Sequence, residues 1–231
     1  MKLDIIIPCY NEEQNLLSLL PYLNRTPSLG HIQIFVIDAS QSDDNTQSIC
    51  EQNGVSYLRS DQSQRSIQMN YGAQQSSSEV LLFLHADVTP PKDYYELIKE
   101  AIEDNNSCGC FAYKFDSNKI LLKLNSYFTK YKGFFTGGGD QGLFITRDAF
   151  NALEGFCAKH VIMEDFDLYK RVKTKGFRFK IIKSKAIVSA RKYVKNSWLR
   201  VNLINLIAVL RYKINPDPQS IKIFYHKWLN N

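Results

Sequence analysis

The chain has 231 residues, 44% of them hydrophobic and 23% charged, with five cysteines and no CxxC pair, which is typical of a globular protein and favours neither a disulfide framework nor a zinc site. The net charge of +6, concentrated in residues 171–195, is compatible with a phosphate ligand, an anionic membrane surface, nucleic acid or a solvated basic face. No run approaches the ~20 apolar residues of a membrane span, and a strand rather than a signal peptide opens the chain, so we expect a cytoplasmic protein.

The first hundred residues alternate short apolar runs with amphipathic segments. Strands are predicted over 3–8, 32–37, 55–59 and 80–84, and helices over 12–23, 43–53, 64–75 and 90–103. Asn11 is expected to cap the first helix, and Pro90 to start the fourth. Runs that are apolar at every position are typical of a parallel sheet covered on both faces. The pattern predicts an α/β protein with a mostly parallel, doubly wound central sheet and helices on both faces.

The second half of the chain has a different order of elements. Strands are predicted over 108–115, 143–146, 177–182 and 186–190, and helices over 119–132, 147–153 and 164–175, with a mostly helical segment from residue 194. A glycine-rich loop, Gly137–Gly142, precedes the second of these strands. No internal repeat and no low-complexity linker divides the chain, so one mixed α/β domain is the simplest architecture.

Two carboxylates closely follow apolar strands. Asp38 comes directly after one strand, and Asp87 follows another after His85 and Ala86. Ligands of open α/β sheets bind just beyond the carboxyl ends of the strands. Asp38 is therefore a candidate acceptor for a nucleobase or ribose, and Asp87 a candidate ligand for a Mg²⁺ or Mn²⁺ ion that bridges phosphate oxygens. The alternative for each is a structural turn or N-cap residue.

Charged residues also stand at two predicted helix starts. Arg65 opens one helix, where a guanidinium beside the backbone N–H groups suits a diphosphate; a plain surface arginine is the alternative. Glu164 and Asp165 open another, where the helix dipole alone favours acids. Asp165 shares a helical face with Leu168 and Val172. We therefore expect Asp165 to point inward and Glu164 to lie at the edge of that face.

The segment 197–210 is apolar nearly all round. One helical stripe consists of Leu199, Leu203, Leu206, Ile207 and Leu210, and other apolar residues lie off it. The segment is too short to span a membrane. Three placements remain open. The helix is buried in a dimer interface, lies in a membrane surface with Arg200, Arg211 and Lys213 at the headgroups, or is buried in the core.

Taken together, these residues resemble family 2 glycosyltransferases of the GT-A fold, in particular their short, single-domain bacterial members. The matching phrases, in the family's order, are Ile5–Glu12, Ile37–Asp43, Gln68–Asn70, His85–Asp87, Gly139–Gly142 and Met163–Asp165. Each phrase alone is weak, whereas all of them in register are specific. The resemblance implies one domain over 1–231, with a nucleotide-binding half (1–105), an acceptor and catalytic half (106–193) and a C-terminal helical segment (194–231).

The resemblance implies an inverting, metal-assisted glycosyltransferase that uses a nucleotide-diphosphate sugar and an acceptor hydroxyl. The implied donor-binding residues are Pro8, Tyr10, Glu12, Asp38, Arg65, Asp87, Asp140 and Gln141. Asp87 would contact the divalent cation, Mn²⁺ or Mg²⁺, and Asp165 would be the catalytic base. The acceptor stays open: a lipid-linked or cell-envelope glycan precursor at the inner face of the membrane is one candidate, and no nucleic-acid partner is expected.

Three positions depart from the family's usual pattern. Ala39 follows Asp38 where a second Asp or a Gly is common, His85 takes the first DxD position, and Ile67 stands where relatives often have an arginine. These departures predict either weaker binding of metal and diphosphate or an inactive enzyme. A nucleotidyltransferase is one alternative, disfavoured because no glycine-rich loop follows the first strand. A non-catalytic nucleotide-sugar-binding protein or membrane-associated scaffold is the other.

Overall fold

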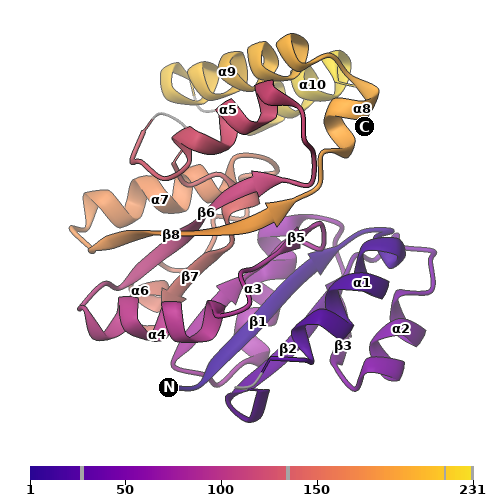
Figure 1. Ribbon diagram of the computed structural model, residues 1–231, viewed down its shortest axis with the longest axis vertical. Helices are drawn as coiled ribbons and strands as arrows, with labels where there is room; N and C mark the ends of the chain where they lie inside the picture. The colour runs from indigo at the N-terminus through magenta and orange to yellow at the C-terminus, as the bar shows by residue number, and fades with distance from the viewer. Residues whose placement is uncertain (27–28, 134–135, 216, 230–231) are drawn as a thin grey trace.

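The computed structural model describes residues 1–26, 29–133, 136–215 and 217–229. Its centre is an eight-stranded sheet (Figure 1). The strands are β1 (Leu3–Cys9), β2 (Ile32–Asp38), β3 (Ser56–Arg59), β4 (Val80–Phe83), β5 (Val88–Thr89), β6 (Cys108–Phe115), β7 (Leu143–Thr146) and β8 (Phe179–Val188), in the order β3-β2-β1-β4-β7-β6-β8-β5. The helices are α1 (Glu13–Leu23), α2 (Thr46–Asn53), α3 (Arg65–Gln75), α4 (Tyr94–Glu103), α5 (Ile120–Phe128), α6 (Arg147–Ala152), α7 (Glu164–Thr174), α8 (Arg191–Lys195), α9 (Trp198–Ile214) and α10 (Pro218–Trp228), with short 3₁₀ turns η1 (Leu29–His31) and η2 (Gly139–Gln141).

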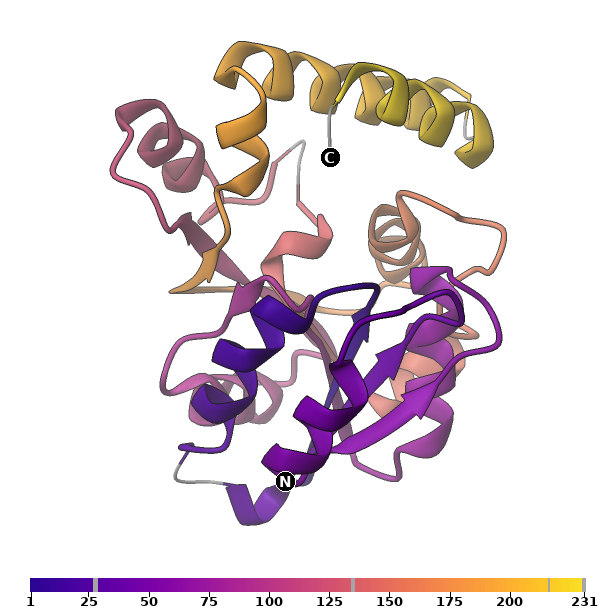
Figure 2. The same ribbon diagram turned by 90° about the vertical axis from the view of Figure 1, so that its right-hand side faces the viewer.

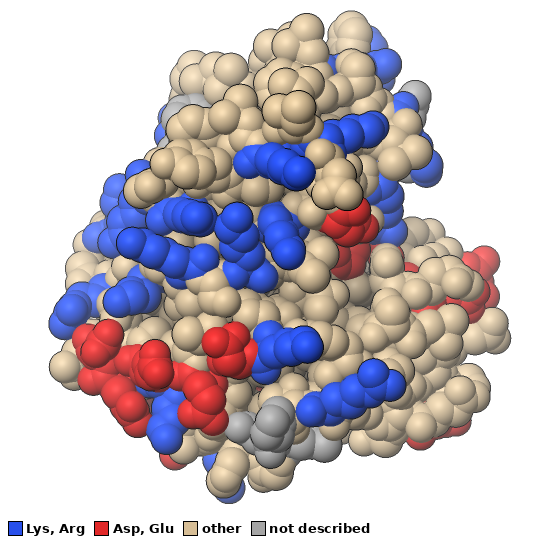
Figure 3. Space-filling view, viewed as in Figure 1, with Lys and Arg blue, Asp and Glu red and all other residues tan. Residues whose placement is uncertain are grey.

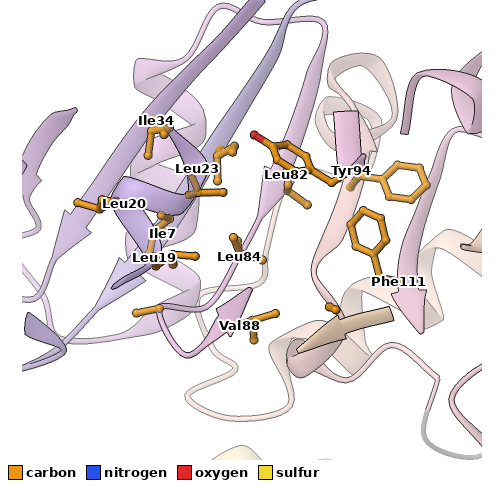
Figure 4. Packing of buried hydrophobic residues seen from close by; sticks show 14 of the residues in the cluster. Ile7, Leu19, Leu20, Leu23, Ile34, Leu82, Leu84, Val88, Tyr94 and Phe111 are labelled. Atoms are coloured by element: carbon orange, nitrogen blue, oxygen red, sulfur yellow. The ribbon is translucent and has the colours of Figure 1, made fainter. Parts of the chain in front are cut away.

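Strand β1 explains why the first strands contain runs of consecutive apolar residues. It lies between β2 and β4 in a parallel arrangement, and its side chains alternate between two cores because neighbouring strand residues point to opposite faces. Ile5 and Ile7 belong to the core that includes α1, α2 and α4, and Figure 4 shows Ile7 close to Leu19 of α1. Ile6 belongs to the core on the other face, with α3, α6 and α7. The predicted sheet with helices on both faces is confirmed.

Strand β8 is continuous where the sequence suggested two strands, 177–182 and 186–190, and that prediction was wrong. The break expected between them is an irregularity inside one strand. Phe111 of β6 pairs with Ile182, whereas the next residue, Ala112, pairs with Lys185. The residues between Ile182 and Lys185 are accommodated as a bulge, which bends a strand without ending its pairing.

Sequence reasoning missed the two-residue strand β5, which ends the sheet. It follows β4 after only residues 84–87, yet it pairs with β8, several strands away from β4 in the sheet order. A chain running from Phe83 to Val88 spans at most about 18 Å. The sheet must therefore curl until its far end returns close to the end of β4. The segment with His85 and Asp87 lies on this short connection.

Asn11 does not cap α1, contrary to the prediction. The N-cap position is Glu12, and it makes no capping hydrogen bond through its side chain. The Asn11 amide oxygen instead accepts hydrogen bonds from the Ser42 hydroxyl and the Asp43 N–H, both at 3.0 Å. Because Asn11 adopts a positive φ of 52°, its side chain turns towards the loop after β2. The two loops that follow β1 and β2 are thereby held together.

The last three helices lie beyond the ends towards which β1 and β8 point (Figures 1 and 2). The Ser197 hydroxyl and the Asp217 carboxylate cap α9 and α10 by accepting hydrogen bonds from backbone N–H groups. This confirms the expected helical C-terminal segment.

The helix predicted from Pro90 begins only at Tyr94, after a turn. None of the helices in the described ranges is long and apolar enough to cross a membrane.

Candidate active site

The carboxyl ends of β1, β2 and β4 gather polar side chains, as the sequence predicts. Tyr10 follows β1 and is 53% exposed, Asp38 ends β2, and Asp87 lies on the connection after β4. Because β2 and β4 flank β1 on either side, these residues stand along one edge of the parallel half of the sheet.

Asp38 is a buried carboxylate whose partners are already in place. The Tyr57 hydroxyl donates a hydrogen bond to its Oδ2 at 3.0 Å, and the Cys9 thiol lies 3.6 Å from its Oδ1. Burial, together with the charge of Asp38, raises the pKa of Tyr57 to about 12. The phenol therefore keeps its proton and remains a donor. Asp38 is held rigidly at the end of β2.

Arg191 connects two of the predicted site carboxylates, and sequence reasoning missed it. Its guanidinium contacts both carboxylate oxygens of Glu12, at 2.6 Å and 3.0 Å, and lies 3.6 Å from Oδ2 of Asp87. A bidentate arginine–carboxylate pair of this kind fixes geometry as well as charge. The signal was present as the basic run 171–195, but a charge excess alone does not single out the residue that reaches the site.

Asp140, an exposed residue of the turn η2, acts electrostatically on Asp87. Its charge raises the pKa of Asp87, second only to the effect of burial. Crowded carboxylates of this kind favour a bound cation, and Mg²⁺ and Mn²⁺ accept one or two protein carboxylates together with phosphate oxygens. Asp87 therefore fits such an ion. Within the described parts of the chain, no group of three or more His, Cys, Asp or Glu side chains is placed to hold a metal ion.

Arg65 and Glu164 bring the starts of α3 and α7 together. Arg65 Nε lies 2.9 Å from Glu164 Oε1, and the Glu164 side chain is only 1% exposed whereas that of Arg65 is 47% exposed. The prediction that Glu164 lies at the edge of its helical face was wrong. A buried carboxylate needs a charged partner, and here the partner comes from a distant helix, which periodicity within α7 cannot reveal.

Asp165 lies beside this pair and is partly buried. Its helical face points inward as expected, since Leu168 and Val172 are fully buried. Burial is the main cause that raises the pKa of Asp165 well above its usual range, and the neighbouring Glu164 carboxylate adds to it. A carboxylate whose pKa is raised in this way is a stronger base than a free aspartate.

Gly139 allows Asp165 to approach His85. A Cβ atom at Gly139 would lie closer than 3.0 Å to Oδ2 of Asp165 and to the imidazole of His85. The absence of a side chain at Gly139 therefore leaves room for both the Asp165 carboxylate and the His85 ring. Burial, then the charge of Arg65, lowers the pKa of His85, so the imidazole is neutral at pH 7.

Two further predicted donor-binding residues, besides Asp38, lie inside the protein. Pro8 is buried within β1. Gln141 is also buried, and its amide accepts a hydrogen bond from the Gly137 N–H at 3.1 Å and donates to the Phe111 carbonyl at 3.4 Å. Gln68 has a similar bracing role, because its amide donates to the carbonyls at the ends of β1 and β2, at 2.8 Å and 2.7 Å. Gln141 and Gln68 thus hydrogen-bond to the backbone around the site from inside the protein.

The curled mixed sheet, with acidic residues at the ends of β2 and β4 and in the first turn of α7, defines a GT-A glycosyltransferase fold. The family model described as "Glycosyl transferase family 2" matches residues 4–159, and the chain belongs to this family. The resemblance seen in the sequence is confirmed. Among curated proteins, none matches the chain.

Solved structures share this fold at low sequence identity. S. aureus TarS 1-349 in complex with UDP-GlcNAc is 16% identical with a TM-score of 0.69, covering 99% of this chain and 71% of that chain. The mannosyltransferase PcManGT from Pyrobaculum calidifontis, in complex with GDP-Man and Mn2+, is 14% identical with a TM-score of 0.69, at 97% and 68% coverage. Glucosyl-3-phosphoglycerate synthase from Mycobacterium tuberculosis, in complex with Mn2+, UDP and phosphoglyceric acid, is 12% identical with a TM-score of 0.64, at 93% and 78% coverage.

Proposed function

We propose that this protein is an inverting glycosyltransferase that moves a sugar from a nucleotide-diphosphate sugar to an acceptor hydroxyl, assisted by a divalent cation. The observation that carries the proposal is the Asp165 carboxylate. Its pKa is raised, and it lies beside Gly139 and the His85 ring. The charge of Asp140 raises the pKa of both Asp165 and Asp87, so the three carboxylates belong to one cluster. Membership of glycosyl transferase family 2 supports transfer chemistry on this site.

Two arginines would bind the donor diphosphate. Arg65 opens the 11-residue helix α3, and its guanidinium would bind the diphosphate together with the backbone N–H groups of the first turn. Arg191 is exposed, and its charge lies beside those of Glu12 and Asp87. The complexes of the three neighbours with UDP-GlcNAc, GDP-Man and UDP support a nucleotide-sugar donor.

Asp165 would take the acceptor proton. As the acceptor oxygen bonds to the anomeric carbon, the bond from that carbon to the diphosphate oxygen breaks, and the hydroxyl proton passes to the Asp165 carboxylate. A divalent cation at Asp87, such as the Mn2+ in two of the neighbours, would stabilise the charge of the leaving diphosphate. A single inverting displacement needs one base and no carboxylate nucleophile, and one suitably placed carboxylate is what α7 supplies.

The test separates donor binding from turnover. Calorimetric titration with UDP, GDP and their sugars in the presence of Mn²⁺ should find at least one ligand whose affinity falls about tenfold or more, about 1.4 kcal/mol, in Asp87→Ala. Asp165→Asn should keep the donor affinity and lose most donor hydrolysis, whereas Asp61→Asn, on an exposed turn, should match the wild type. Wild-type affinity in Asp87→Ala, or wild-type turnover in Asp165→Asn, would contradict the proposal.

A non-catalytic nucleotide-sugar-binding protein is the second candidate. Two observations favour it. The buried His85 takes the first position of the DxD motif, where a carboxylate is usual, and Arg191 contacts Asp87, the proposed metal ligand. A binding protein of this kind retains its ligand without turnover. A measurable dissociation constant with no hydrolysis of the bound nucleotide sugar, with Mn²⁺ present, selects this candidate.

A further inference from the structure

Helix α5 presents an apolar stripe to solvent. Its exposed residues are Ile120, Leu121, Leu124, Tyr127 and Phe128. Their spacing of one, four, seven and eight places them on one face, and Ile120 is 82% exposed. The opposite face of the helix buries Leu122 and Ser126, so the stripe is not needed for packing against the sheet.

Helix α9 presents a second stripe. Leu199, Leu203, Leu206, Leu210 and Ile214 are exposed, with Leu199 at 68% and Ile214 at 82%. The helix packs on the protein through its other face, which includes Val201, Ile204 and Tyr212. The alternative that 197–210 is a fully buried core helix was wrong, because four of the five predicted stripe residues are exposed.

The two stripes form one surface, which we call the α5–α9 face. The Asn125 amide of α5 donates to the Asn202 side-chain oxygen of α9 at 2.9 Å, so the helices touch at this point. Residues three or four apart are neighbours on a helix. Leu121 and Phe128 thus flank Asn125, and Leu199 and Leu206 flank Asn202. Apolar side chains border the contact on both helices.

The surroundings of the α5–α9 face are basic. Residues 168–216, which include β8 and α9, contain many Lys and Arg and no Asp or Glu, and the same holds for residues 117–139 around α5. Exposed basic residues next to the stripes are Lys119, Lys123, Lys195, Arg200, Arg211 and Lys213. Figure 3 shows further Lys and Arg in a band over β8, with one group of acidic residues lower, near α4, and others to the right of the band.

We propose that the α5–α9 face docks on the surface of an anionic lipid bilayer. Exposed leucines would enter the boundary of the acyl chains, the aromatic rings of Tyr127 and Phe128 would lie at headgroup level, and the basic border would contact anionic headgroups. A second copy of the chain fits less well, because a symmetric dimer through this face would bring its basic borders together. Docking does not depend on the proposed transfer activity.

Vesicle flotation tests this proposal with the full chain. Vesicles of phosphatidylcholine containing phosphatidylglycerol should carry the protein, and vesicles of phosphatidylcholine alone should carry much less. Phe128→Glu and Leu203→Glu should each lower partitioning about tenfold or more. Leu17→Glu, on α1, changes a leucine of similar exposure outside the face and should leave partitioning unchanged. Melting temperatures close to wild type show that the variants fold.

Two results would overturn the proposal. One is a protein that stays with the aqueous fraction at every content of phosphatidylglycerol. The other is a wild-type protein that sediments as a dimer while Phe128→Glu and Leu203→Glu sediment as monomers, which would make the face a contact between copies. Sedimentation of the wild type as a monomer, with binding to anionic vesicles that weakens as salt is raised, supports docking on lipid.

Discussion

Asp165 determines how the proposed reaction depends on pH. Its pKa is raised by burial and by Glu164 from the value of about 3.9 that a free aspartate has. A general base must be deprotonated, so donor hydrolysis should rise with pH through the raised pKa and then level off. A profile of kcat from about pH 4 to pH 9 measures this. A rate that is already at its maximum near pH 4 would show that another group limits the reaction.

The same shift predicts a pH effect on stability. Because the pKa is higher in the folded state, the folded protein binds this proton more tightly, and the resulting stabilisation is lost as pH rises through the folded pKa. Asp165→Asn cannot ionise, so its melting temperature should exceed that of the wild type at about pH 8 and approach it near pH 4. Asp61→Asn is the control. A lower melting temperature for Asp165→Asn at alkaline pH would contradict the assigned shift.

Gly139→Ala should impair chemistry more than folding. The added methyl group must push the Asp165 carboxylate and the His85 ring apart, and a displacement of about 1 Å at a catalytic group can cost about 100-fold in rate. We expect a loss of kcat of that order with donor affinity within a few fold of wild type. Gly30→Ala, where no atom lies within 4 Å of the added Cβ, is the matched control. Equal kcat in both variants would contradict this placement of Asp165.

At the scale of single residues, the sequence was sufficient to predict the carboxylates at the ends of the strands. Asp38 and Asp87 could be predicted because each closely follows an apolar run, and parallel strands share one edge. Arg191 and the burial of Glu164 could not be predicted, because each depends on a partner from a distant part of the chain, Glu12 in one case and Arg65 in the other. Neither the spacing of residues nor the composition shows which distant parts of the chain come into contact.

Helix α3 packs closely on the sheet at Gly72. Gly72 faces Ile6 and Ile37, and a Cβ there would lie 2.6 Å and 3.0 Å from their side chains. Gly72→Ala should therefore force α3 away from β1 and β2 and lower the free energy of unfolding by about 1–3 kcal/mol. Urea unfolding of this variant and of Gly30→Ala measures the effect. A neutral or stabilising result for Gly72→Ala would mean that the helix shifts at no cost.

At the scale of elements, hydrophobic pattern predicted the long strands and most helices. It failed where pairing, not composition, defines the element. β5 has only two residues, and its existence depends on β8 lying beside it. The bulge in β8 keeps one strand continuous across polar residues, which in the sequence resemble a turn. Both errors concern the curled end of the sheet, which is formed by contacts between distant segments.

For the whole molecule, the two expected halves should not be separable. Residues 1–105 include β4 and β5, but the partners of these strands on the other side, β7 and β8, lie outside that fragment. A fragment ending at residue 105 should lack a cooperative thermal transition and should not bind the UDP or GDP ligand of the full chain. Circular dichroism and calorimetry check this. Binding by the fragment with full-length affinity would show that the nucleotide-binding half stands alone.

The short connection from β4 to β5 also affects the protein while it is being made. A ribosome adds about 5–20 residues per second, so β5 emerges several seconds before β8, the strand with which it pairs. During that interval the apolar side chains of Leu84 and Val88, which are buried in the finished protein, have no sheet end to cover them. The nascent chain should therefore bind a chaperone until β8 has been synthesised, and then release it.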